Sequence, residues 1–159
     1  EASFGWHTWV WAKLQNERGG SPAYVYYMDQ RPPYAADSRN ADVAGVPHGA
    51  ELPYVFKKLE LTPLPWTEAD RRISDAMATY WTNFAKTGNP NGADLPRWPA
   101  FTAKDQQRMV FKGTPQARSY DNLAQLEAMD AYFAWRRTAE GQEFGKHGGN
   151  TNSSPLGLR

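Results

Sequence analysis

The 159-residue sequence contains no cysteine, and this absence excludes three kinds of chemistry. Disulfide bonds, thiolate metal ligands and cysteine nucleophiles all require a thiol. The absence does not identify the cellular compartment, because some secreted proteins lack disulfides just as cytoplasmic proteins usually do. Secreted, periplasmic and cytoplasmic locations therefore all stay open.

The sequence also lacks an excess of charge of either sign. Eighteen Lys and Arg residues stand against 17 Asp and Glu residues, which gives a formal net charge of +1. Nucleic-acid-binding domains usually carry a clustered basic surface, and single-strand binders interleave it with aromatic residues. No such run occurs here, so we expect no nucleic-acid partner.

Long apolar runs are missing as well. No stretch approaches the roughly 20 residues that a membrane-spanning helix needs, so we expect no membrane span. The first residues, EASFGWHTW, lack the basic start and the apolar stretch of a signal peptide. They resemble the interior of a longer chain.

Aromatic side chains are abundant, with 7 Trp, 8 Tyr and 7 Phe. Residues 4–15 are apolar on nearly every face, which predicts a helix buried on all sides. AYVYYM, residues 23–28, is short and continuously apolar, as is typical of a central strand covered on both faces. Only one weak partner strand, 108–111, is available. The pattern indicates an α/β protein whose other strands lie outside this sequence.

Residues 67–88 form the clearest predicted helix. Thr67 and Asp70 make a capping-box-like start, and Gly88 with the following Asn-Pro marks the end. Apolar residues then fall on one face at helical spacing. The predicted core-facing residues are Ile73, Met77, Tyr80, Trp81 and Phe84.

The remaining chain divides into a loop, a helix and a tail. Residues 30–47 are polar and rich in Pro, Ala, Asp and Asn, and loops of this length are often functional. Residues 123–137 carry the spacing of a last amphipathic helix. Residues 1–139 are therefore expected to be ordered, and residues 140–159 to form a flexible tail, because their composition cannot offset the ordering entropy.

His48 is the candidate catalytic residue, because it lies just past the long loop between Pro47 and Gly49. A catalytic histidine needs a nucleophile within reach, and loop histidines are more often merely solvated. The nearest elbow-like motif is GGSPA, 19–23, but Ser21 precedes a strand instead of following one. His7 is expected in a helix core and His147 in the tail, so no metal site is expected.

Two blocks of sequence resemble one family. GVPHGAELPYVF, residues 45–56, resembles the histidine motif of the type-B carboxylesterases, which include para-nitrobenzyl esterases and cholinesterases. YWTNFAKTGNPNG, residues 80–92, followed by LPRWPAF, 95–101, resembles the next block of the same family. AYVYYMD resembles the last strand of its central sheet, and the similarity runs in order over about residues 4–112.

The resemblance implies the C-terminal part of an α/β-hydrolase fold, comprising the last central strand, the histidine loop and the flanking helices. It implies a Ser–acid–His mechanism without cofactor or metal. His48 matches the catalytic histidine, and Glu51 matches a buried acid that supports the site. The serine, the triad acid and the oxyanion hole would come from an N-terminal part of the same enzyme, and the substrate would be a small-molecule ester.

Two other functions stay open. Some relatives of this family have lost catalysis, so a hydrolase-like binding or adhesion domain is the main alternative. Glu51 also has a plainer interpretation, as a surface acid stabilised at the start of a short helix. A small carbohydrate-binding module is disfavoured, because it predicts alternating strands where residues 67–88 are helical.

Overall fold

The computed structural model describes residues 4–146. These residues belong to two compact units. The sheet unit is Ala12–Tyr120, and the helical unit is Glu1–Trp11 with Asp121–Arg159. The boundary falls within helix α1 (Gly5–Arg18). This helix confirms the one predicted over 4–15, but it is not buried on all sides in this chain, because Trp11 is 71% exposed.

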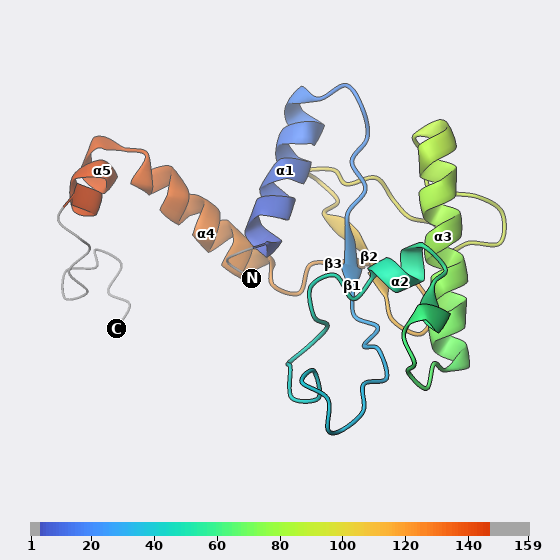
Figure 1. Ribbon diagram of the computed structural model, residues 1–159. Coiled ribbons are helices and arrows are strands. Elements are labelled where there is room, and N and C mark those ends of the chain that lie inside the picture. Colours follow the sequence, from blue (N-terminus) through green and yellow to red (C-terminus); the bar gives the residue numbers. More distant parts are fainter. Residues whose placement is uncertain (1–3, 147–159) are drawn as a thin grey trace. The chain divides into compact units, whose positions relative to one another are not determined.

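The sheet unit is built on three strands, β1 (Tyr26–Met28), β2 (Gln107–Phe111) and β3 (Gln116–Ser119), in the order β1-β2-β3 (Figure 1). β1 and β2 are parallel, with Tyr27 opposite Val110, and β2 and β3 are antiparallel. Among residues 4–146, no strand pairs with the other edge of β1. The parallel pair with an open edge is the arrangement expected of part of a larger α/β sheet.

The strand predictions are partly wrong. β1 covers only half of 23–28, and Tyr26 and Tyr27 are 37% and 42% exposed, so the strand is not covered on both faces in this chain. β2 confirms the weak candidate at 108–111. β3 was not predicted, because its polar sequence QARS has no apolar alternation and it pairs through its backbone with β2.

Helix α3 (Glu68–Thr87) forms as the sequence predicts. Thr67 and Asp70 complete a capping box, and Gly88 ends the helix with a left-handed backbone (φ 74°) that glycine adopts without strain. Ile73, Met77 and Tyr80 are fully buried. Trp81 is half-buried and Phe84 is 48% exposed, so the predicted apolar face is fully covered only up to Tyr80.

The core of the sheet unit lies between α3 and β2, and its aromatic rings pack mostly edge to face. The ring centroid of Trp98 is 5.2 Å from that of Tyr80 and 5.7 Å from that of Phe111. The indole Nε1 of Trp98 also donates to the backbone oxygen of Val25, at 3.1 Å. Trp98 therefore joins the helix, both parallel strands and the loop 89–99. Edge-to-face pairs add about 0.5–1.5 kcal/mol each to their burial.

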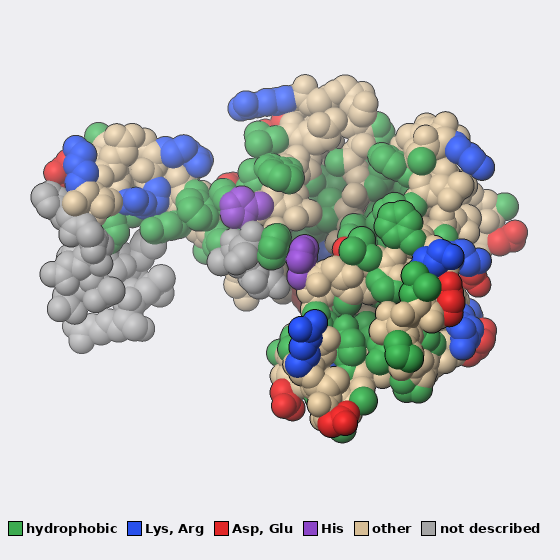
Figure 2. Space-filling view, in the orientation of Figure 1, with side chains coloured by type: hydrophobic (Ala, Val, Ile, Leu, Met, Phe, Trp, Pro, Cys, Tyr) green, Lys and Arg blue, Asp and Glu red, His purple; other side chains and the backbone are tan. Residues whose placement is uncertain are grey.

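Two short helices connect the long loop to α3. They are α2 (Leu52–Val55) and the 3₁₀ helix η1 (Leu59–Leu61). α2 packs directly on α3, and hydrophobic side chains are visible on the surface around these helices (Figure 2). Phe56 and Leu61 are among the exposed ones.

The helical unit contains α4 (Leu123–Arg136) and α5 (Ala139–Lys146). α4 confirms the helix predicted over 123–137. The rings of Trp6 and Phe133 stack with centroids 4.3 Å apart. α5 departs from the flexible tail expected from residue 140, and residues 147–159 lie outside the described residues. None of the helices within residues 4–146 is long and apolar enough to cross a membrane.

Candidate active site

His48 lies in a tight turn at the end of the long loop. The backbone N–H of Ala50 donates to the carbonyl of Pro47 at 3.2 Å, which closes the turn around the histidine. Gly49 has φ 81°, a left-handed conformation in which any other residue would be strained. The His48 side chain is exposed in this chain. His48 therefore lies on an exposed turn that directly follows the loop 30–47.

Helix α2 begins four residues after His48 and is anchored to α3. Tyr54 is fully buried, and its hydroxyl donates to Asp70 Oδ1 at 2.8 Å. Ser74 Oγ donates to the backbone oxygen of Tyr54, also at 2.8 Å. These two bonds fix α2 on α3 from both the side chain and the backbone of one residue. They hold the chain that follows His48.

Asp70 is the centre of this network. It is 1% exposed, and its carboxylate accepts four hydrogen bonds. Gln30 Nε2 and the Tyr54 hydroxyl bind Oδ1, both at 2.8 Å, and the backbone N–H and hydroxyl of Thr67 bind Oδ2 at 2.9 and 2.6 Å. Gln30 Oε1 accepts in turn from the N–H of Gly113, at 3.0 Å. The segments after β1 and after the histidine turn thus meet at one carboxylate, and Gln30 links the segment after β2 to it.

The pKa values of Asp70 and Tyr54 are shifted by this contact. Burial acts to raise the pKa of Asp70, but the hydrogen bonds from Thr67, Gln30 and Tyr54 outweigh it and lower the pKa below its ordinary value. Burial and the Asp70 charge raise the pKa of Tyr54. At neutral pH the pair is therefore an ionised carboxylate that accepts from a neutral phenol.

The lowered pKa of Asp70 predicts an acid-labile network. The unfolded chain binds the proton first, so the stabilisation is complete above the unfolded pKa of about 3.9 and is lost as the pH falls through the lower, folded value. Melting temperatures of the parent and Asp70→Asn, measured from pH 6 to pH 2.5, should differ most at pH 6 and converge in acid. Asp75→Asn, on the exposed face of α3, should show no such convergence. A constant gap between parent and Asp70→Asn would contradict the assignment.

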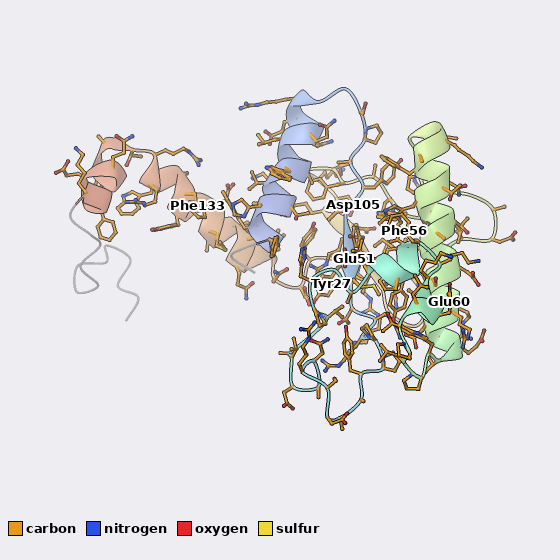
Figure 3. The ribbon with its side chains drawn as sticks, viewed as in Figure 1. Tyr27, Glu51, Phe56, Glu60, Asp105 and Phe133 are labelled. Atoms are coloured by element: carbon orange, nitrogen blue, oxygen red, sulfur yellow. The ribbon has the colours of Figure 1, made fainter. Side chains whose placement is uncertain are left out.

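Glu51 stands at the N-cap of α2 and makes no side-chain capping bond (Figure 3). Glu51 is half-buried in this chain, and its burial in the complete enzyme stays a prediction. Burial raises the pKa of Tyr26, and the negative charge of Glu51 raises it further, so the carboxylate acts on the edge strand β1. The acid is thus near the strand but is only half-buried.

An open groove of about 400 Å³ lies beside the histidine turn. It contains the ion pair between Lys112 Nζ and Asp29 Oδ2, at 2.8 Å. The groove is lined by Asp29, Gln30, Arg31, Gly45, Val46 and Lys112. It lies beyond the ends of the parallel strands β1 and β2, the edge at which open α/β sheets bind their ligands.

The other sequence candidates lie elsewhere. His7 was expected in a helix core but is exposed on α1, with its ring 4.9 Å from that of Trp6. Ser21 follows α1 and accepts a hydrogen bond at its backbone oxygen from Gln15, in a bend that does not open a helix. His147 is outside the described residues. Within residues 4–146, His, Cys, Asp and Glu side chains form no group of three that could hold a metal.

Sequence reasoning missed two residues of the network that anchors helix α2, the helix that follows the histidine turn. Gln30 lay in a segment described only as a polar loop, and Asp70 was identified only as a capping residue. The capping box predicted the hydrogen bonds of only one Asp70 oxygen, Oδ2. The other binds Gln30 and Tyr54, which are 40 and 16 residues away in sequence. The only sequence signal for this contact was Tyr54, whose hydroxyl lies in a short helix after the histidine and can bind a buried acceptor.

The fold and the position of the turn define a class, the α/β-hydrolases, of which this chain has a C-terminal portion, as the sequence predicted. A thermophilic PNB esterase aligns over 73% of this chain and 23% of its own length, with TM-score 0.60 and 22% identity. An esterase of Clostridium hathewayi, described as hydrolysing aliphatic aromatic polyesters, aligns over 80% of this chain and 24% of its own, with TM-score 0.67 and 23% identity.

Sequence comparison names the family. A model of the carboxylesterase family matches residues 3–129, and the chain belongs to that family. Cocaine esterase of Homo sapiens is 37% identical over 87 residues, which cover 54% of this chain. Liver carboxylesterase 1 of Oryctolagus cuniculus is 40% identical over 99 residues, which cover 62%. The matches span 15% and 17% of these two relatives, so the chain corresponds to a small part of their length.

Proposed function

We propose that this chain supplies the catalytic histidine, His48, of a carboxylic ester hydrolase. The serine nucleophile, the triad acid and the oxyanion hole come from an N-terminal part of the same enzyme. The observation that carries the proposal is an exposed histidine on a closed turn, within the motif GVPHGAELPYVF and within the family match. Residues 1–139 are then the C-terminal segment of the catalytic domain, and the isolated chain is inactive.

His48 acts first as a base and then as an acid. Its Nε2 takes the proton of the serine hydroxyl as the serine oxygen bonds to the ester carbonyl carbon. It returns that proton to the leaving alcohol as the C–O bond breaks. A water molecule then repeats both steps and releases the carboxylic acid. General acid–base help of this kind contributes about 10²- to 10⁴-fold.

Glu51 supports the site from the start of α2. Its carboxylate already acts on Tyr26 of β1, and a neighbouring strand on the open edge of β1 would enclose both. Enclosure strengthens electrostatic interactions, because the local dielectric falls. Glu51 is thus a supporting acid and not the acid that holds His48.

The apolar surface of the sheet unit supports a partner on the β1 side. An open hollow of about 340 Å³ is lined almost entirely by aromatic rings and prolines, and it includes Tyr26 of the edge strand, with Trp81 and Phe84 of α3. Exposed apolar patches of this kind mark interaction surfaces. In this proposal, the N-terminal part of the enzyme is the partner that covers this hollow.

Labelling with an alkyl fluorophosphonate tests the proposal against a non-catalytic binding domain. An activated serine oxygen attacks phosphorus, the P–F bond breaks, fluoride leaves, and His48 takes the proton. The complete enzyme should label with one equivalent, and His48→Ala should label at least 100-fold more slowly. Exposed His7, replaced by alanine, should leave the labelling rate unchanged. If the complete parent neither labels nor hydrolyses short aryl esters, the chain belongs to a binding domain.

A further inference from the structure

We propose that Arg31 is a positioning residue for His48, because its side chain fixes the segment 40–45 that leads into the histidine turn. The inference rests on the proposed function of His48. Arg31 lies three residues after β1, and it reaches across the long loop to its far limb. No feature of its local sequence marks it, because it stands in a Pro-rich polar segment.

The guanidinium of Arg31 donates to four backbone carbonyls of one short stretch. Nη2 binds the oxygens of Asn40 and Ala41, both at 2.7 Å. Nη1 binds the oxygen of Gly45 at 3.0 Å and also that of Val43. The stretch 40–45 has no helix or strand, so its carbonyls have no partners in regular secondary structure. One side chain therefore replaces the hydrogen bonds that a sheet or helix would give.

The clamped stretch leads directly into the turn. Gly45 is three residues before His48, and its φ of 76° redirects the chain at the last clamped carbonyl. Three residues span at most about 11 Å, so displacement of Gly45 is passed to the imidazole through a very short tether. The guanidinium also lies 5.7 Å from the ring centre of Tyr34, which confines it further.

Arg31 and its neighbour Gln30 hold the two sides of the turn. Arg31 binds the chain before His48, and Gln30 binds Asp70, which holds Tyr54 in the helix after His48. Both residues follow Asp29, whose N–H donates to the Phe111 oxygen at 3.0 Å and so continues the β1–β2 ladder. Two adjacent side chains therefore connect the histidine turn to the end of the sheet and fix its position.

Lysine cannot replace arginine in this role. The planar guanidinium carries five N–H donors in a fixed fork, and it spreads them over two nitrogens that here face four carbonyls. A lysine ammonium offers three donors from a single point. A positioning role therefore predicts a large loss for Arg31→Lys, although the charge and most of the stem are retained.

Steady-state kinetics of the complete enzyme test the role. Arg31→Ala should lower kcat on a short-chain aryl ester about 100-fold with KM within threefold, because a displaced catalytic group costs about that much. Arg31→Lys should lower kcat at least tenfold. Added guanidinium chloride at 20 mM should restore at least tenfold to Arg31→Ala, whereas sodium chloride at equal ionic strength should not. Exposed Arg39 of the same loop, replaced by alanine, is the matched control and should keep the parent kcat.

The outcomes separate this inference from the proposed function. If folded Arg31→Ala keeps kcat within threefold, or if Arg39→Ala loses as much, Arg31 does not position His48. If Arg31→Ala fails to fold, Arg31→Lys decides, and a parent-like kcat overturns the inference. Activity of His48→Ala within tenfold of the parent sinks the proposed function instead, whatever Arg31 does.

Discussion

Replacing His48 with alanine in the complete enzyme is expected to lower kcat on a short-chain aryl ester by about 10⁴- to 10⁶-fold. Members of a serine–histidine–acid unit act together, so the loss of the base alone removes nearly the whole contribution of the unit. What remains comes from the oxyanion hole and from substrate binding. Stopped-flow and steady-state assays with a chromogenic aryl ester measure the loss.

The fold should barely respond to the same replacement. His48 is exposed in a turn that is closed through the backbone, so its side chain buries little packing area. The melting temperature should stay within a few degrees, since surface replacements usually change stability by less than about 0.5 kcal/mol. His7→Ala, an exposed histidine on α1, should keep both the rate and the melting temperature. Activity of His48→Ala within tenfold of the parent would refute the assignment.

Replacing Asp70 with alanine is expected to produce the largest loss of stability of any single change near the site. The replacement leaves the Tyr54 hydroxyl, the Gln30 amide and the Thr67 N–H without their acceptor inside the protein. Hydrogen bonds to a charged group contribute about 1.5–3 kcal/mol each, and a buried donor left unsatisfied costs a further penalty. We expect the free energy of unfolding to fall by about 3–5 kcal/mol.

Urea denaturation of the complete enzyme, followed by tryptophan fluorescence, measures this change. The matched control is Asp75→Ala on the same helix, where the carboxylate pairs with Lys57 at 2.6 Å but both side chains are more than half exposed. An exposed ion pair of this kind contributes at most about 1 kcal/mol. Equal denaturation midpoints for the two variants would show that the Asp70 network does not stabilise the fold.

The stability change should also reach the site. Asp70 holds Tyr54, and Tyr54 holds α2, which follows the histidine turn. At a temperature where Asp70→Ala is still folded, the backbone amides of residues 50–56 should exchange hydrogen faster than in the parent. Local opening of this kind follows the loss of the contacts that close a segment.

Local sequence determined the elements whose stabilising contacts are close in sequence. Helix α3 was predicted to within one residue at each end, because Thr67, Asp70 and Gly88 act within four residues of their backbone partners. Helix α4 and the histidine loop followed from composition and periodicity. The family followed from two ordered blocks, because each carries many residues in a fixed register, and the family match confirms it.

Tertiary structure alone decided how the candidate site is held. β3 forms because its backbone pairs with that of β2, and its side-chain pattern does not predict this pairing. Phe84 and Glu51 are more exposed than their patterns indicate, because a periodic pattern records which face is apolar and not whether this chain covers it. Asp70 binds Gln30 and Tyr54, which are 40 and 16 residues away, and Arg31 binds carbonyls 9 to 14 residues away. Such contacts form only because the fold brings distant segments together, and no local pattern of residues encodes which segments meet.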